Sequence, residues 1–242
     1  MDYHFKTPED LEIENELEKA KIKSSFFYSG IFVSCLWLIQ FIQFALKMNF
    51  SSSGILPRNI SGIPGIFLSP LIHADFSHLV SNSLTLFLLL FGIFYFYRTS
   101  VIKVFFIIYF VPGILVWLFA RQSYHIGASG IVYGFAAFLF FSGVFRKDKR
   151  SIALSLLIVF LYGGMVWGIL PTDPAISFES HFFGAVTGII CAFIYRKNDP
   201  PPVYEWEEES EIENFENDNY DDGKEPEDAE IEDDADPNDF KR

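Results

Sequence analysis

Six long runs of apolar residues, separated by short polar segments, fill the chain between residues 26 and 195. A helix needs about 20 mostly apolar residues to cross the hydrocarbon core of a bilayer, and each run approaches that length. The predicted membrane-spanning helices cover residues 26–46, 79–97, 104–120, 126–145, 151–170 and 175–195. The first five runs contain no Asp, Glu, Lys or Arg, while the sixth carries Glu179 and His181 near its start. The pattern therefore predicts an all-α integral membrane protein, a six-transmembrane-helix bundle.

Basic residues are distributed unevenly over the segments that connect these runs. The segment before the first run and the segments after the second, fourth and sixth hold 12 Lys and Arg residues up to residue 197, and the alternate segments hold three. Basic connections tend to stay in the cytoplasm. We therefore expect both termini to be cytoplasmic. Because residues 1–25 are long and charged, we expect the first run to be a true span rather than a signal peptide.

The long connection between the first two runs, residues 47–72, is then expected on the outer side. It contains three prolines and several apolar residues. Such a segment is expected to lie on the membrane surface rather than to extend into water.

The overall composition indicates a different kind of segment at the C-terminal end of the chain. Half of the 242 residues are hydrophobic and 18% are aromatic, yet the formal net charge is −13. The negative charge is concentrated in residues 198–242, which hold 20 acidic and three basic side chains. We therefore expect a cytoplasmic N-terminal segment (1–25), a membrane domain (26–197) and an acidic, disordered cytoplasmic tail (198–242). The alternative role for the tail is to dock a cytoplasmic partner.

Charge and cysteine content exclude two other classes of protein. The chain has no basic face that would neutralise phosphates, so no nucleic-acid partner is expected. The two cysteines, Cys35 and Cys191, both lie inside apolar runs, which argues against a secreted fold held together by disulfides.

Polar side chains gather at the outer ends of three predicted spans. His78 and Asn82 lie one turn apart on one face of the second span, Ser129 lies one turn into the fourth, and His181 lies one or two turns into the sixth. These three helices run in the same direction, so the side chains are expected at a similar depth, roughly 5–10 Å below the outer helix ends. Ionisable groups inside a span are costly to insert and usually serve a function.

A serine, a histidine and hydrogen-bond donors at one level form an acyl-transfer site. His181 would take the proton of Ser129 and later protonate the leaving amine. The amide of Asn82, the ring of His78 and the backbone N–H of Ser129 would stabilise the oxyanion. No aspartate is placed to orient the imidazole of His181. Tyr133, four residues after the serine, could pack its ring against that imidazole instead.

Glycine pairs in the fourth and sixth spans favour close approach of these two helices. Gly130 and Gly134 are four residues apart, as are Gly184 and Gly188. Small residues at this spacing let helix backbones come together in lipid. The spacing therefore predicts that the serine and histidine can come within hydrogen-bond distance.

Three separated motifs resemble, in order and position, those of the rhomboid intramembrane serine proteases. The segment HADFSHLVSN at residues 73–82 is similar to the H-x4-H-x3-N motif of the family's second helix. GASG at residues 127–130 is similar to the nucleophile motif G-x-S-G, and HFFGAVTG at residues 181–188 is similar to H-x2-G-x3-G of the sixth helix. Each motif alone is common, but the three together, at the same ends of alternate spans, are specific. The resemblance covers the six spans.

The resemblance implies a hydrolase, a serine endopeptidase that cleaves transmembrane proteins near the outer membrane face. It would make Ser129 the nucleophile and His181 its base, with His78 and Asn82 at the oxyanion. Two further residues would support the site, namely Gly127, which shapes the nucleophile loop, and His73. No metal or organic cofactor is implied. The partners would be transmembrane substrates and the lipid bilayer. Apart from the resemblance, a bacterial inner membrane is the simplest expectation for the location.

The chain departs from the family pattern at two positions. The family often carries a Trp-Arg pair in the first outer connection, where this chain has no tryptophan, so the packing of that connection is left open. Ser180 stands where alanine commonly precedes the catalytic histidine, and this change keeps a small residue.

Two alternatives stay open on the residues alone. One is a rhomboid-like pseudoprotease that binds membrane proteins without cleaving them, although such relatives lack the serine or the histidine. The other is a metallohydrolase using His73, Asp75, His78 and His181. His73 and His78 are five residues apart and do not share a helix face, and the chain contains no H-E-x-x-H motif. His125 is expected to lie at the water interface without a role in the site.

Overall fold

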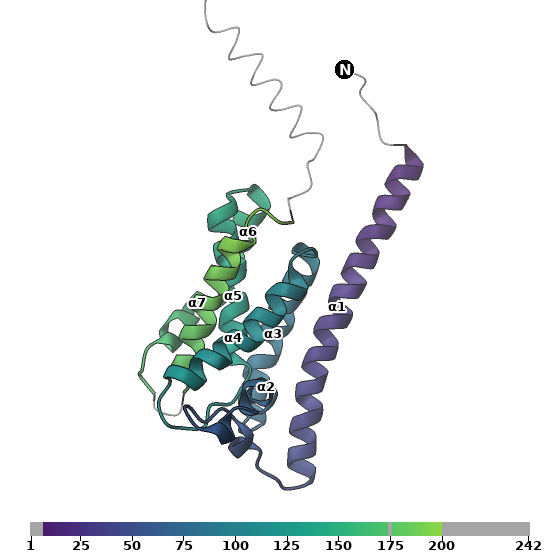
Figure 1. Cartoon of the computed structure of the whole chain (residues 1–242). Helices are drawn as coiled ribbons and strands as arrows, with labels where there is room; N and C mark the ends of the chain where they lie inside the picture. The colour runs from purple at the N-terminus through teal and green to yellow at the C-terminus, as the bar shows by residue number, and fades with distance from the viewer. Residues whose placement is uncertain (1–6, 174–175, 200–242) are drawn as a thin grey trace, which may run out of the picture. The chain divides into compact units, whose positions relative to one another are not determined.

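The computed structural model describes residues 7–173 and 176–199. The main α-helices of this part of the chain are α1 (Pro8–Ala45), α3 (Phe76–Phe96), α4 (Val101–Phe119), α5 (Ser129–Arg146), α6 (Lys149–Tyr162) and α7 (Phe178–Ile194) (Figure 1). The predicted acidic tail lies outside the described residues, except for Asn198 and Asp199.

The described helices are those of a multi-pass membrane protein. Five helical segments are long and apolar enough to cross a bilayer: α1, α3, α4, α5, and α6 together with the 3-10 turn that follows it. Helix α7 is apolar but has only 17 residues, a length of about 26 Å at 1.5 Å per residue. The predicted fold class, an all-helical membrane bundle, is confirmed.

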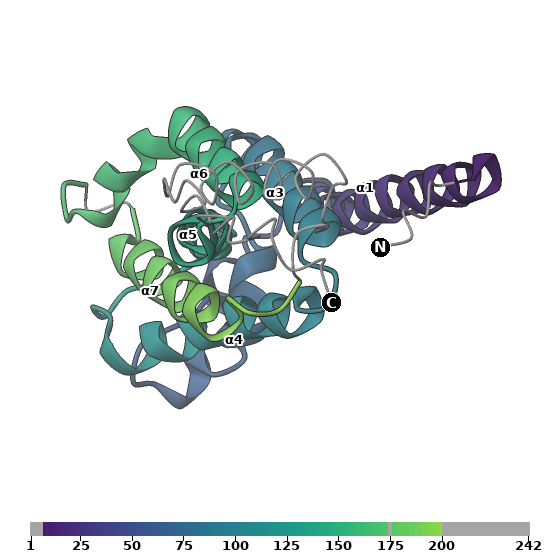
Figure 2. The same ribbon diagram turned by 90° about the horizontal axis from the view of Figure 1, so that it is seen from above.

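Helix α5 lies at the centre of the bundle, with α3, α4, α6 and α7 around it (Figure 2). Its side chains Phe135, Phe138 and Leu139 are almost completely buried. Helix α6, in contrast to α5, exposes large apolar side chains. Leu156 and Phe160 are largely exposed, as a lipid-facing surface requires. The long α1 packs against α3 on the outside of the bundle. A residue at the start of α5 is therefore held by neighbours on several sides.

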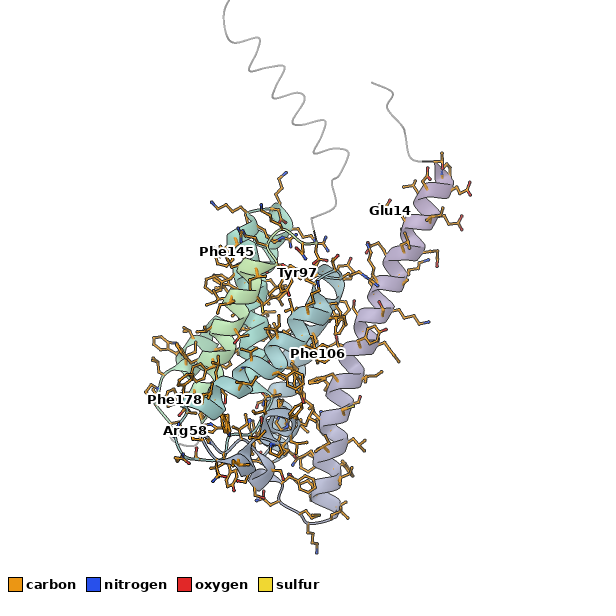
Figure 3. The ribbon with its side chains drawn as sticks, in the orientation of Figure 1. Glu14, Arg58, Tyr97, Phe106, Phe145 and Phe178 are labelled. Carbon is orange, nitrogen blue, oxygen red and sulfur yellow. The ribbon has the colours of Figure 1, made fainter. Side chains whose placement is uncertain are left out.

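The chain runs back and forth, so that alternate helices begin at the same end of the bundle. Arg58 and Phe178 lie at one end, while Tyr97 and Phe145 lie at the other (Figure 3). The N-terminal ends of α3, α5 and α7 accordingly share the end that carries Arg58. This is the end at which the sequence places the candidate site residues.

The segment between α1 and α3 is built of short helical turns: η1 (Ser51–Ser53), η2 (Ile60–Gly62), α2 (Gly65–Leu68) and η3 (Ser69–Leu71). Trp117 at the end of α4 donates its indole N–H to the carbonyl oxygen of Asn59 at 2.9 Å. Arg58 binds back, through its backbone N–H to Trp117 O at 2.8 Å and its guanidinium to Ala120 O at 2.8 Å. Trp117 of α4 therefore binds this connection, which contains no tryptophan itself. Its placement on the membrane surface stays a prediction.

The fifth predicted span is not one regular helix. Helix α6 ends at Tyr162, and a 3-10 segment, η4 (Gly163–Ile169), completes it. Gly163, Gly164 and Gly168 lower the helix propensity of this stretch, because glycine loses the most backbone freedom in a helix. The predicted start of the sixth span, residue 175, lies outside the described residues. Helix α7 itself begins at Phe178, with Ser177 as its N-cap.

The last described residues are bound to the end of the bundle opposite Arg58. The carboxylate of Asp199 accepts the hydroxyl of Ser100 at 2.7 Å, and the guanidinium of Arg146 donates to the carbonyl oxygen of Asn198 at 2.7 Å. The first two residues of the predicted tail are therefore bound to the ends of α4 and α5.

Candidate active site

Ser129 is the first residue of α5, at the end of a turn that requires glycine. Gly127 adopts φ +107°, a conformation that side-chain-bearing residues rarely adopt, and its N–H donates to Ser69 O at 2.8 Å. A Cβ atom at this position would also lie 2.8 Å from Cε1 of His78. Gly127 thus allows both the turn and the close approach of the His78 ring to the segment before Ser129.

The structure brings Ser129 and His181 together, from α5 and α7. Nε2 of His181 lies 2.8 Å from the hydroxyl oxygen of Ser129. The other ring nitrogen, Nδ1, lies 2.8 Å from the carbonyl oxygen of Gly168. Because a carbonyl can only accept, Nδ1 carries the proton and Nε2 presents its lone pair to the serine hydroxyl. This tautomer is the one that a general base requires.

The ring of Tyr133 lies flat on the imidazole of His181. The two ring centroids are 4.1 Å apart, and the ring planes differ by 9°. The hydroxyl of Tyr133 donates to Met165 O at 2.6 Å, which fixes the tyrosine to the chain segment that also supplies Gly168. The imidazole is therefore oriented by a backbone carbonyl at its edge and by a tyrosine ring on its face. The carbonyl binds Nδ1, the nitrogen to which many serine hydrolases present a carboxylate.

The predicted glycine pairs of α5 and α7 face one another. A Cβ atom added to Gly184 would lie 2.1 Å from the carbonyl oxygen of Gly130, and one added to Gly188 would lie 2.1 Å from that of Gly134. Any side chain at these positions would overlap the backbone of α5. The close backbone approach is what allows the short side chain of serine to reach the histidine on the neighbouring helix.

His78, Asn82, Ser129, Tyr133 and His181 all line one cavity of about 680 Å³. Its walls come from α3, α5, α7, η4 and the connections at the Arg58 end. The amide of Asn82 donates one hydrogen bond to the carbonyl oxygen of His78 at 3.0 Å. An amide nitrogen carries two hydrogens, so one more remains to bind an acceptor in the cavity.

His73 contacts the turn that precedes Ser129. Its Nε2 accepts the backbone N–H of Ala128 at 3.4 Å, and its ring meets that of His78 edge to face at 5.1 Å. Burial, together with the neighbouring His78, lowers the pKa of His73 to about 4. The ring is therefore neutral at physiological pH and can accept that N–H.

The four residues of the metallohydrolase alternative do not form a metal site. Among the residues that the structure describes, no three His, Cys, Asp or Glu side chains gather as a metal site would require. Asp75 instead caps α3, where its carboxylate accepts the backbone N–H of His78 at 2.8 Å.

One residue of the site was misjudged from the sequence. His125 is only 2% exposed, so the expectation that it simply lies at the water interface is wrong. Its Nδ1 lies 2.5 Å from the hydroxyl of Ser177, the N-cap of α7. The available signal was the spacing: His125 precedes Ser129 by four residues, and Ser177 precedes His181 by four.

Comparison with known proteins shows the family of this chain. The family model for the rhomboid domain matches residues 62–198, more than half of the chain. Uncharacterized proteins of Mycobacterium bovis and Mycobacterium tuberculosis are each 30% identical over 172 residues, covering 67% of this chain and 72% of their own. One of Mycobacterium leprae is 28% identical over 67% of this chain and 68% of its own. The chain belongs to the rhomboid family.

Proposed function

We propose that this rhomboid-family protein is an active intramembrane serine endopeptidase with Ser129 as nucleophile and His181 as general base. The observation that carries the proposal is the 2.8 Å contact between the serine hydroxyl and Nε2, with the opposite nitrogen bound to a carbonyl. A pseudoprotease that only binds membrane proteins has no need of a histidine held in this one tautomer.

The reaction would proceed by acyl transfer. Ser129 Oγ attacks the scissile carbonyl carbon while Nε2 of His181 takes its proton, and the carbonyl oxygen becomes an oxyanion. The imidazolium then protonates the departing amine, and the C–N bond breaks to leave an ester on Ser129. A water molecule, deprotonated by His181, hydrolyses that ester and regenerates the serine. The oxyanion would be bound by the Ser129 N–H, Asn82 and His78.

The substrates would be transmembrane proteins that enter the bundle from the bilayer. The cavity lies at the end of the bundle where α3, α5 and α7 begin, and the distribution of basic residues supports the outer face as the location of this end. Both termini would then be cytoplasmic. Relatives from mycobacteria support a bacterial cell membrane as the location.

Labelling of the purified protein with a fluorophosphonate probe tests the proposal. We expect covalent labelling of the wild type that persists in the presence of a chelator and disappears in Ser129→Ala, because only an activated serine reacts with this probe. Folding of both proteins is checked by thermal unfolding in the same detergent. A folded wild type that is not labelled would favour the pseudoprotease, and labelling that a chelator removes would favour a metal-dependent enzyme.

The oxyanion role of Asn82 predicts a partial loss of activity. Asn82→Ala is expected to lower the labelling rate about 10-fold to 1000-fold, the range found when one oxyanion donor is removed. Ser81→Ala is the matched control, since Ser81 also lines the cavity and donates to the same His78 carbonyl, at 2.8 Å. If both substitutions had the same small effect, Asn82 would have only a local role in its helix.

A further inference from the structure

A second serine–histidine pair joins the same two segments of chain as the Ser129–His181 pair. In this second pair the histidine comes from the α5 side and the serine from the α7 side. His125 lies on the segment that leads into α5, and Ser177 lies at the start of α7. Nδ1 of His125 is 2.5 Å from the hydroxyl of Ser177. The two pairs are thus offset by four residues on both segments, and both line the same cavity.

The hydrogen bonds around this second pair have a defined direction. Nε2 of His125 lies 3.1 Å from the carbonyl oxygen of Arg121 and donates its proton there. Nδ1 is therefore an acceptor, and the hydroxyl of Ser177 donates to it. Ser177 in turn lies 2.7 Å from the hydroxyl of Ser180 and accepts its proton. The hydroxyl of Ser177 thus donates to His125 and accepts from Ser180, in a chain of hydrogen bonds that ends one residue before His181.

The backbone of His125 is itself firmly held. It forms an isolated antiparallel bridge with Ile55, with N–H to O distances of 3.0 and 2.9 Å. A second contact holds the start of α7 to the same segment, because the guanidinium of Arg121 donates to Ile176 O at 2.6 Å. The start of α7 is thus attached to a segment that is bound on its other side to the connection between α1 and α3.

The segment η4, which precedes α7, is more exposed. None of the residues of η4 is buried, and Val166 and Trp167 are more than half exposed. Yet η4 supplies the carbonyl of Gly168 that orients His181. The glycine pairs set how closely α7 packs on α5, and residues 121–128 add polar contacts that hold the start of α7.

We propose that His125 and Ser177 are positioning residues, a clamp that fixes α7 against the start of α5 and so sets the Ser129–His181 distance. The inference rests on the proposed function, since that distance matters only to a working catalytic pair. Ser177 and His181 belong to one helical turn, so a shift of the cap moves the imidazole with it. A misplacement of about 1 Å in a catalytic group can cost 100-fold in rate.

Two substitutions of His125 distinguish the loss of the hydrogen bond to Ser177 from the loss of the ring's other contacts. The amide of His125→Asn reaches the place of Nδ1 and can still accept from Ser177. The amide of His125→Gln reaches the place of Nε2, keeps the bond to Arg121 O and leaves Ser177 without this acceptor. We expect the fluorophosphonate labelling rate to stay within about threefold of wild type in His125→Asn and to fall about 10-fold to 100-fold in His125→Gln.

A double-variant cycle and a spectroscopic signal complete the test. Ser177→Ala also removes the N-cap of α7 and is expected to lose at least as much rate as His125→Gln, and adding His125→Gln to it should cause no further loss. The Nδ1–H proton of His181, assigned in NMR spectra by its absence in His181→Ala, should be retained in His125→Asn and broadened or lost in His125→Gln. Equal rates for the two His125 variants, or losses that multiply in the double variant, would overturn the clamp.

Failure of the clamp can be told apart from failure of the proposed function. A wild type that is not labelled contradicts the proposed protease, whatever the His125 variants do. The His181 proton signal does not depend on catalysis. An unchanged signal in His125→Gln would therefore reject the clamp even in a protein without activity, and a lost signal would support it.

Discussion

Replacing His181 with alanine is expected to slow fluorophosphonate labelling of Ser129 by about four to six orders of magnitude, as loss of the histidine does in other serine hydrolases. A serine hydroxyl is a weak nucleophile unless a base takes its proton as it attacks. In this protein Nε2 of His181 lies 2.8 Å from that hydroxyl. The measurement is the second-order rate constant of labelling, with thermal unfolding as a check that the variant is folded.

Tyr133→Phe is the matched control for this prediction. The substitution keeps the aromatic ring that lies 4.1 Å from the imidazole and removes only the hydroxyl that binds Met165 O. We expect a loss of less than about tenfold, because the Gly168 carbonyl still selects the tautomer. A His181→Ala protein that kept a tenth or more of the wild-type rate would contradict the role of His181 as base.

Replacing Gly184 with alanine is expected to cost about 100-fold in labelling rate or more, although Gly184 touches no reacting atom. The added Cβ would lie 2.1 Å from the carbonyl oxygen of Gly130, and neither backbone can give way without separating α7 from α5 by about 1 Å. Because Gly130 follows Ser129 directly, that separation lengthens the Ser129–His181 hydrogen bond. Overpacking of this kind is also expected to lower the free energy of unfolding by about 1–3 kcal/mol.

Two further glycines make this prediction specific. Gly30→Ala is the control, because a Cβ at Gly30 on α1 would meet nothing within 4 Å, and both rate and stability should stay near wild type. Gly188→Ala would overlap Gly134 O at 2.1 Å, further from Ser129 along the helices. It should lower stability as much as Gly184→Ala but reduce the labelling rate less. An active and stable Gly184→Ala protein would mean that the helices do not approach as closely as the structure has them.

The sequence by itself determined the class of fold and the identity of the candidate pair. Uninterrupted apolar runs predict membrane-spanning helices, because no unpaired backbone group is tolerated in lipid. The sequence places Ser129 and His181 near the starts of two apolar helices that run in the same direction, with glycine pairs beside them. It predicts Ser129 one turn into its helix, whereas Ser129 is the first residue of α5. These features depend on residue type and spacing, which the sequence states directly.

Only the tertiary structure decided how the histidine is held. The group that selects its tautomer is the backbone carbonyl of Gly168, and every residue has such a carbonyl, so no residue type marks it. That carbonyl belongs to η4, the 3-10 segment that follows α6, and η4 packs against α7, which carries His181.

The roles of Trp117 and His125 were equally hidden from the sequence. Trp117 binds Asn59, and His125 binds Ser177, each across more than 50 residues of chain. Hydrophobic periodicity reports which face of a helix is buried but not which helices are neighbours or which polar atoms meet. Contacts between polar groups distant in sequence depend on the relative placement of whole helices, and packing of the bundle sets that placement.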